Sequence, residues 1–527
     1  MPGSSQSSSE STPLLAHPAD QLQQQPPAGP DGASASSTSG WLSWRKPGIV
    51  LLLPPMFVHY IAQIMIQISL LYLVLMVACY RIKSPDSSTI FSTEPDDQNC
   101  NDPAVQALSA FWLSTLSVVT GITELVVTPI VGFISDRYGR NIIMGMNAVG
   151  GIVYSVGIIA LAHFGGDMWV LILILSAQAL LGGVAANEIF GSAYIADITD
   201  KKSRATYFTM LESCMSVALM LGPLAAGALS KINLLVVYYV AVVLEAVVFL
   251  YVVFILPESL KKPSGPTANG PAGGSITTTK PNLKQTITGV IKNYSDSIGY
   301  ISRFLTSNSH TTSLRIMLLC TFLLSMSATG FMSIVVLYTN LKFGWDELSL
   351  ASFISMVSAS KLLMQTLVLP VLFRMVSRQP KAEDRAFWEL IFIRSAYLGY
   401  AASIVVTAFI TEGWQMIFVA ILDTIVIVAR PVTRSIFSRL VSVEEQGRLF
   451  SSLSVLQQLA SILASFLFGF IYSATVSTMA NFTMLLIGSL MTATFIATLF
   501  CNHHDFAGHA EEVVAVEPAE EDPTPAA

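Results

Sequence analysis

The sequence predicts an all-α integral membrane protein with twelve transmembrane helices in two pseudo-symmetric six-helix bundles. Of its 527 residues, 53% are apolar and only 12% are charged, about half the charged share of a soluble globular chain. The mean hydropathy is +0.61, and twelve stretches stay apolar for the roughly 20 residues that a helix needs to cross a bilayer. A flexible linker divides these stretches into two groups of six.

The twelve predicted spans follow one another with mostly short connections. The first contains Pro54 and Pro55, which should kink it or mark its entry, because proline removes a backbone donor. In chain order, we expect spans at about residues 47–79, 107–134, 142–163, 168–195, 204–230, 234–256, 313–339, 347–376, 386–410, 413–438, 447–474 and 478–501.

The lysines and arginines orient these spans, because positive residues favour the cytoplasmic side of a membrane. With both termini placed in the cytosol, the inner tail and loops hold 21 of the 28 lysines and arginines, and the outer loops hold 4. We therefore expect a multi-pass protein with both ends cytosolic.

The expected domain boundaries follow from the spans and from composition. The linker runs through KKPSGPTANGPAGGSITTTKPN, whose Pro, Gly, Ser and Thr content is typical of flexible chain. The Ser- and Gln-rich amino-terminal tail cannot form an apolar core. We expect a disordered cytosolic tail at 1–46, a first bundle at 47–256, a cytosolic linker at 257–312, a second bundle at 313–501 and an acidic cytosolic tail at 502–527.

An internal repeat supports two related halves. DITDKKSRATYFTMLESCMSVALMLGPLAAGAL follows the fourth span, and VSVEEQGRLFSSLSVLQQLASILASFLFGFI follows the tenth. Each has an acidic turn, an arginine, a polar first turn and then an apolar helix with small residues. Two such halves describe a transporter with a site near the bilayer midplane.

The turn between the second and third spans reads GFISDRYGRN. It resembles the signature loop of the major facilitator superfamily, G-x-x-x-D-R-x-G-R, and PESL and GPLAAG match further family features. With AYIADITD and CNDPAVQ, the chain resembles a fungal member related to tetracycline-resistance-type efflux proteins, with the branch of the proton-coupled folate transporter as a close cousin. The resemblance covers about residues 47–501 and implies the major facilitator fold.

In the family, the signature loop latches the two halves on the cytosolic side and releases as the cavity opens inward. The residues agree with this role: Gly132 and Gly139 allow close approach and a tight turn. Asp136 can accept hydrogen bonds from a neighbouring helix start or arginine, and Arg137 and Arg140 lie at headgroup level. The alternative is a static loop that only fixes topology.

Ionisable and polar groups within spans usually face the bundle interior or a water-filled path. His59, Gln63 and Gln67 are spaced four apart and share one helix face, and Glu245, Lys361, Gln365 and Arg394 are also intramembrane. Hydrogen bonding between helices would explain any single one of these groups. For the set we predict a proton or substrate path formed by His59, Gln63, Gln67, Glu124, Gln178, Glu188, Glu212, Asp423 and Arg430.

Proton coupling needs a carboxylate that desolvation allows to titrate near neutral pH. By depth and by the quality of the polar stripe, the order of preference is Glu124, Glu188, Glu212 and Asp423. Arg430 could act as the competing cation or hold an anionic substrate. It lies two turns from Asp423, which is a long reach for direct contact, so each could pair with a neighbouring helix instead.

The fifth span contains Gly222, Pro223 and Gly227 in an element that resembles the antiporter motif G-P-x-x-G-G. Ordinary small-residue packing is the alternative explanation. Two departures weaken the antiporter interpretation: Ala218 replaces an earlier glycine, and Gln178 stands where drug:proton antiporters carry an arginine. The protein must then relay protons otherwise, or be a symporter or uniporter.

Two further features concern location. Cys79 and Cys100 bracket the first outer loop, where a disulfide is chemically allowed. Glu10, Leu14 and Leu15 in the amino-terminal tail resemble an acidic dileucine signal, which sends membrane proteins to vacuoles or lysosomes. We expect the vacuolar or the plasma membrane.

The sequence therefore predicts a secondary active transporter of a small organic solute, working by alternating access and coupled to protons, with efflux or vacuolar loading favoured. The alternatives are a proton-coupled uptake symporter and a non-transporting receptor with the same fold. No G-x-x-x-x-G-K-[ST] phosphate loop occurs, which disfavours a nucleotide-driven pump. We expect no enzyme activity, cofactor, metal or nucleic-acid partner, and a monomer in the lipid bilayer.

Overall fold

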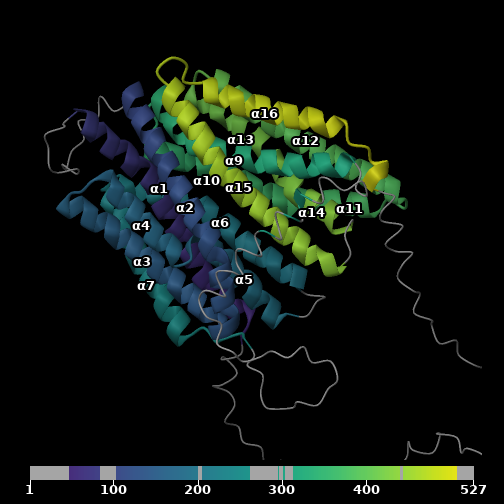
Figure 1. The fold of residues 1–527 in the computed structure, drawn as a ribbon, viewed down its shortest axis with the longest axis horizontal. Coiled ribbons are helices and arrows are strands. Elements are labelled where there is room, and N and C mark those ends of the chain that lie inside the picture. The colour runs from purple at the N-terminus through teal and green to yellow at the C-terminus, as the bar shows by residue number, and fades with distance from the viewer. Residues whose placement is uncertain are drawn as a thin grey trace, which may run out of the picture. The chain divides into compact units, whose positions relative to one another are not determined.

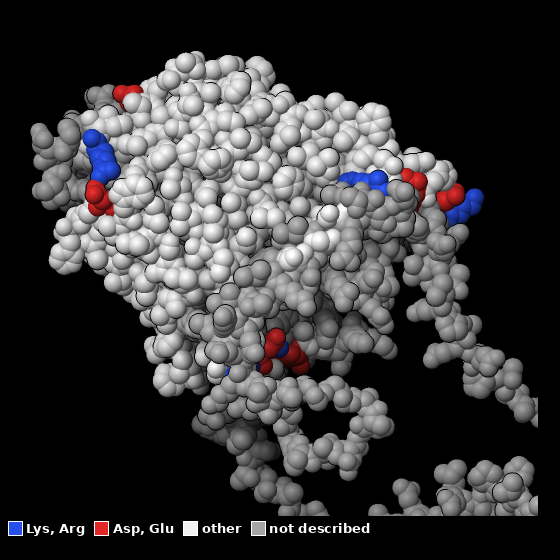
Figure 2. Space-filling view, in the orientation of Figure 1, with Lys and Arg blue, Asp and Glu red and all other residues white. Residues whose placement is uncertain are grey.

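The computed structural model describes residues 47–83, 102–199, 204–260, 295, 299, 301–302, 312–439 and 443–506. Eleven helices in these ranges are long and apolar enough to cross a membrane. The fourth predicted span is present as two shorter apolar helices, so the predicted twelve-span fold is confirmed. Figure 2 shows a broad face of described residues without charged side chains, with charges gathered at its margins.

The first half is built from seven helices that account for six spans (Figure 1). They are α1 (Ile49–Lys83), α2 (Pro103–Tyr138), α3 (Arg140–Phe164), α4 (Met168–Leu180), α5 (Gly183–Ile198), α6 (Arg204–Ser230) and α7 (Leu234–Phe254).

The second half contains six spans, several of which combine different helix types. Its elements are α9 (Thr312–Phe343), α10 (Glu347–Leu363), η2 (Met364–Val368), α11 (Leu369–Ser377), α12 (Ala382–Phe409), η3 (Gly413–Gln415), α13 (Met416–Thr424), η4 (Ile425–Val428), α14 (Ala429–Arg439), α15 (Val443–Thr475) and α16 (Phe482–Leu499).

Local sequence explains where several helices begin. Asp102 caps α2 by accepting a hydrogen bond from the backbone N–H of Ala104, and Pro103 follows at the first helical position, where its missing donor costs nothing. Asn233 and Asp346 cap α7 and α10 in the same way. These caps fix the outer ends of three spans in the predicted topology.

The fourth span is broken, which corrects the expectation of one continuous helix over 168–195. Gly182 and Gly183 separate α4 from α5 and have φ angles of +128° and +55°. Residues with a side chain rarely adopt these conformations, so glycine is needed here. The apolar pattern continues through the break and therefore gave no signal for it.

Two spans of the second half are irregular at the same place in the bundle. The eighth passes through the π-helix η2, and the tenth passes through the 3₁₀ segment η4. These two segments contact each other. Such departures from the α-helix concentrate at functional sites, because they re-aim side chains and free backbone groups.

The two halves meet through α6 against α10 and through α2 against α15 (Figure 1). Hydrogen bonds reinforce these contacts: Ser69 Oγ donates to Glu347 Oε1 at 2.7 Å, and Gln106 Nε2 donates to Asn340 Oδ1 at 2.8 Å. These residues lie in helix ends or outer portions that the predicted topology assigns to the outer side. The halves are therefore sealed together at that end.

Candidate functional site

A buried ionisable pair lies inside the first half. His59 Nδ1 of α1 is 2.7 Å from Glu245 Oε2 of α7, and both side chains are fully shielded from solvent. Gln63 Nε2 donates to the second carboxylate oxygen, Oε1, at 2.9 Å. Because buried ionisable groups are costly in a membrane protein, their presence marks a candidate functional site.

Amide side chains extend this pair into a network across five helices. Asn147 Nδ2 of α3 is 3.2 Å from His59 Nε2 and 2.8 Å from Asn187 Oδ1 of α5. Gln178 Nε2 of α4 donates to Gln63 Oε1 at 2.8 Å. Hydrogen bonds therefore connect the charge of this pair to every helix of the first half except α2 and α6.

Gly151 of α3 makes room for the network. A Cβ atom at this position would lie 2.7 Å from Glu245 Oε1 and 2.9 Å from Gln63 Nε2. Both separations are too short for a real contact, so a glycine is needed for α3 to approach the pair this closely.

The structure brings together three of the predicted path residues, His59, Gln63 and Gln178. It adds Glu245, which the sequence places in a span but not in the path, and Asn147 and Asn187, which sequence reasoning missed. The signal for Glu245 was available, because it is the single charged residue among the 21 of α7. Gln67 is exposed on α1 and does not join the network.

Glu124, the first-ranked carboxylate, lies at the break in the fourth span instead. Its Oε1 atom accepts a hydrogen bond from the backbone N–H of Val184, at 3.2 Å, in the first turn of α5. A carboxylate is favourable at a helix start, where backbone donors are unpaired. Glu212 is exposed on α6, and the side chain of Glu188 lies outside the described residues.

Asp423 forms an ion pair with the eighth span rather than with Arg430. Lys361 Nζ of α10 lies 2.5 Å from Asp423 Oδ2 of α13, directly before η2 and η4. Asp423 is buried, and Lys361 keeps a third of its side chain exposed. Of the two arrangements that the sequence left open, the structure has the pairing with a neighbouring helix.

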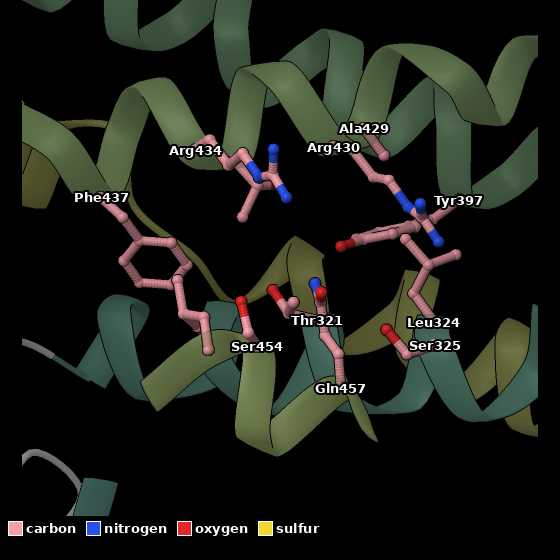
Figure 3. A pocket seen from close by; sticks show the side chains of 12 residues that line it. Thr321, Leu324, Ser325, Tyr397, Ala429, Arg430, Arg434, Phe437, Ser454 and Gln457 are labelled. Atoms are coloured by element: carbon pink, nitrogen blue, oxygen red, sulfur yellow. The ribbon is translucent and has the colours of Figure 1, made fainter. Parts of the chain in front are cut away.

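Arg430 lines a cavity of about 300 Å³ within the second half. Figure 3 shows Arg430 and Arg434 reaching from α14 across the cavity toward Thr321 and Gln457. A larger cleft of about 1020 Å³ lies between the halves, lined by α1, α6 and α11. Both volumes are in the range that holds small organic molecules.

The signature residues form a charged cluster at the α2–α3 junction. Arg140 donates to Asp136 Oδ1 at 2.5 Å and to Asp197 Oδ2 at 2.9 Å. Glu258 accepts from the backbone N–H groups of Arg140 and Asn141, at 2.7 and 3.1 Å. These contacts join α2, α3, α5 and the residues after α7, all in the first half, so the latch between halves stays a prediction.

Two details differ from the expected loop. Asp136 and Arg137 belong to the last turn of α2, and Gly139 alone, at φ +119°, connects α2 to α3. A Cβ atom at Gly132 would meet nothing within 4 Å, so the expected close approach at Gly132 is wrong. Arg137 is exposed, with its guanidinium 5.5 Å from the Tyr138 ring centroid.

The glycines of the fifth span pack tightly on both neighbours. A Cβ atom at Gly222 would lie 2.8 Å from Ile64 of α1, and one at Gly227 would lie 2.9 Å from the Cα atom of Leu348 of α10. Pro223 stands between them inside α6. The element therefore permits close packing of α6 within its half and against the other half.

Cys79 is disulfide-bonded. Its predicted partner, Cys100, lies outside the described residues, so the pairing of the two stays a prediction. The remaining described cysteines, Cys214, Cys320 and Cys501, are free thiols.

Comparison with known proteins agrees with the fold. The chain is 25% identical over 489 residues to the MFS-type transporter avaJ of Aspergillus versicolor, which covers 90% of this chain and 92% of that protein. It is 24% identical over 429 residues to the lysosomal proton-coupled steroid conjugate and bile acid symporter of Gallus gallus, with 78% and 83% covered. Tetracycline resistance proteins and proton-coupled folate transporters also match.

Among solved structures, the human organic anion transporter MFSD10 (TETRAN) superposes with a TM-score of 0.55 and 14% identity, over 86% of this chain and all of that one. The family model for the Major Facilitator Superfamily matches residues 56–465. With its twelve spans in two joined halves, the chain belongs to the Major Facilitator Superfamily and is a membrane transporter of that type.

Proposed function

We propose that the chain is a proton-coupled secondary active transporter that moves a small organic solute by alternating access. The observation that carries this proposal is the His59–Glu245 pair, which is sealed from solvent inside a network of amides. A histidine and a carboxylate in contact are a chemically suitable pair for accepting and passing on a proton.

The hydrogen bonds indicate where the proton lies in this arrangement. If Asn147 Nδ2 donates to His59 Nε2, then Nε2 is an acceptor, the ring proton is on Nδ1 and Glu245 is ionised. The buried pair then carries one negative charge. Binding one more proton removes that charge, and this changes the free-energy balance between conformations with different exposure of the pair.

Alternating access is supported by the asymmetry between the two ends of the molecule. The outer ends are joined by Ser69–Glu347 and Gln106–Asn340, whereas the cleft of about 1020 Å³ separates α1 and α6 from α11 nearer the inner ends. This is the arrangement expected of an inward-open state. A second state would separate the outer contacts and close the cleft.

For direction, we propose export from the cytosol, across the plasma membrane or into the vacuole. An inward-open cleft would load solute from the cytosol, and several relatives are named for resistance to tetracycline. The dileucine-like Glu10, Leu14 and Leu15, which lie outside the described residues, would favour the vacuole.

Symport is the second candidate, and a specific observation favours it. The fourth span contributes Gln178, not an arginine, to the proton network. In addition, the cavity of the second half is lined by Arg430 and Arg434 and by no acidic residue of the described chain. A proton and an anionic solute would then bind together.

Purified full-length protein in proteoliposomes tests both candidates. With the membrane potential clamped by potassium and valinomycin, accumulation of a radiolabelled organic solute is measured under opposite pH gradients. Accumulation in an acidic lumen supports antiport, and accumulation in an alkaline lumen supports symport. Equal uptake under both gradients contradicts proton coupling.

A further inference from the structure

The cavity of about 300 Å³ in the second half has an unusual combination of charges. It lies among α9, α12, α14 and α15. Two of its lining side chains, Arg430 and Arg434, are cationic, and none of the described residues that line it is acidic. The cavity is therefore an electropositive compartment inside a membrane-spanning bundle.

The two arginines are spaced to act together. They are four residues apart, so they project from the same face of α14, one turn from each other. Neither forms an ion pair with any other residue of the described chain, whereas Lys361 is matched by Asp423. A guanidinium presents several donors in a planar fork that fits carboxylate, sulfonate and phosphate groups.

The opposite wall supplies the remaining polar contacts. Thr321 of α9, and Ser454 and Gln457 of α15, face the arginines across the cavity (Figure 3). The Gln457 amide can donate to an anion's oxygens, and the Thr321 hydroxyl, which donates to the Met317 carbonyl at 2.9 Å, can do so by exchanging that bond. Two cations and several neutral donors around one volume form a site for a charged oxygen-rich group.

The rest of the lining is apolar and aromatic. Leu324, Tyr397, Phe437 and Leu453 cover the walls between the polar groups. Small-molecule sites typically combine such walls with a few placed polar groups that fix orientation. A fully hydrated inorganic ion would gain nothing from these apolar walls.

We propose that this cavity binds an amphipathic organic anion, with its carboxylate, sulfonate or phosphate between Arg430 and Arg434 and its hydrocarbon body against the apolar walls. The proposal rests on the transport function proposed above and specifies the class of the solute. Both arginine side chains are exposed, so an anion can reach them. Its affinity comes from charge-assisted hydrogen bonds to the two guanidinium groups and from burial of its hydrocarbon body.

The test uses two fluorescent dyes with the same ring system and opposite charge. Fluorescein is an organic dianion, and rhodamine 123, whose carboxyl group is a methyl ester, is its cationic counterpart. Binding of each to full-length protein in phosphatidylcholine nanodiscs is followed by fluorescence polarisation. Saturable binding that is at least about tenfold tighter for fluorescein is expected. Equal affinity for the two dyes, or no saturable fluorescein binding, overturns the proposal.

Substitutions of the two arginines test whether the dye binds in this cavity. Arg430→Gln and Arg434→Gln should each weaken fluorescein binding about tenfold or more, and the charge-conserving lysine variants should lose less. Arg385→Gln is the matched control, because Arg385 bonds to the carbonyls of Gln379 and Pro380 outside the cavity. Unchanged binding in the two glutamine variants, or in the lysine variants if the glutamine variants do not fold, overturns the assignment.

A lipid headgroup shares the chemistry of the proposed solute, so a second arm separates them. Nanodiscs that contain phosphatidylglycerol should leave fluorescein binding unchanged. Strong competition by this anionic lipid assigns the site to a headgroup and overturns the solute proposal. Because binding is measured without a pH gradient, loss of anion binding and loss of proton coupling are distinct results.

Discussion

His59 and Glu245 are 186 residues apart in the chain, yet their side chains lie 2.7 Å apart with no access to solvent. The contact ties the first span of the first half to its last span. In the transport function proposed above this pair binds the coupled proton, so its loss should affect coupling more than binding of solute.

Replacement of the pair's carboxylate should uncouple transport from protons. Glu245→Gln keeps the shape and one acceptor oxygen, replaces the other oxygen with an amide donor, and removes the buried charge. We expect at least a tenfold loss of accumulation driven by a pH gradient, with solute exchange at equal pH preserved. His163→Gln, which alters an exposed histidine bonded to Tyr239, serves as the control. Equal losses in accumulation and exchange would contradict a coupling role.

Gly151 and Gly145 provide a matched pair on α3. Gly151→Ala places a methyl group against Glu245 and Gln63, whereas a Cβ at Gly145 meets only Phe249, at 3.9 Å. Overpacking of this kind costs about 1–3 kcal/mol, so Gly151→Ala should unfold at a clearly lower temperature than Gly145→Ala. Similar unfolding temperatures for the two variants in detergent would show that the network can rearrange around the added methyl group at little cost.

Glu124 should stabilise the start of α5. Glu124→Ala removes the acceptor for the Val184 N–H and the negative charge at the helix start, with an expected cost of about 1–2 kcal/mol. Glu124→Gln keeps an acceptor oxygen and should fall between the wild type and alanine. Protection of the α5 amides in hydrogen exchange measures the effect. Equal exchange rates of the α5 amides in Glu124→Ala and in the wild type would show that the contact contributes nothing to stability.

The Lys361–Asp423 pair should show strong coupling in a double-mutant cycle. Asp423→Asn leaves a partly buried lysine without its partner, and a loss of about 1–3 kcal/mol is expected after allowance for the exposed part of Lys361. Lys361→Met should relieve most of this loss in the double variant. Additive effects of the two changes on thermal unfolding would exclude a direct interaction.

Acid should weaken the contacts that Asp346 makes with Ser349 and Lys231 at the outer end of α10. Burial disfavours its charge, but hydrogen bonds from Ser349 and the nearby Lys231 outweigh burial and lower the pKa of Asp346 from its ordinary 3.8. A lowered pKa means that the carboxylate stabilises the folded chain above pH 3.8, and that this contribution is lost as the pH falls through the folded pKa. Asp346→Asn should thus differ from wild type near neutrality and converge with it in acid, as judged by unfolding midpoints.

The sequence was sufficient for much of the fold and for part of the site. Apolar length and the distribution of positive charge predict the spans, and the four-residue spacing correctly grouped His59 with Gln63. The partner of His59 could not be predicted, because a one-dimensional pattern does not say which helices are neighbours. Glu245 was visible as an isolated charge, but its contact with α1 exists only in three dimensions.

The breaks in the helices were hidden for a different reason. Gly182 and Gly183 continue a small and apolar pattern, and glycine is common in membrane helices, so their positive φ angles left no trace. The 3₁₀ segment beside Asp423 contains only isoleucine and valine, and the π segment beside Lys361 mixes apolar residues with Gln365 and Thr366 and has no glycine or proline to mark it. Where a span departs from the α-helix, packing against neighbouring helices determines the backbone conformation.

α1 is a single uninterrupted helix of 35 residues that carries Phe57 in the cleft, His59 in the network and Ser69 at the outer contact. Ten residues of helix place Ser69 about 15 Å from His59 along the axis. A helix transmits tilt along its length with little loss, so in the transport function proposed above protonation near His59 and release of the contact at Ser69 would act through the same rigid helix. Under that proposal, flexible residues inserted between the two positions would let the outer contact open without a proton.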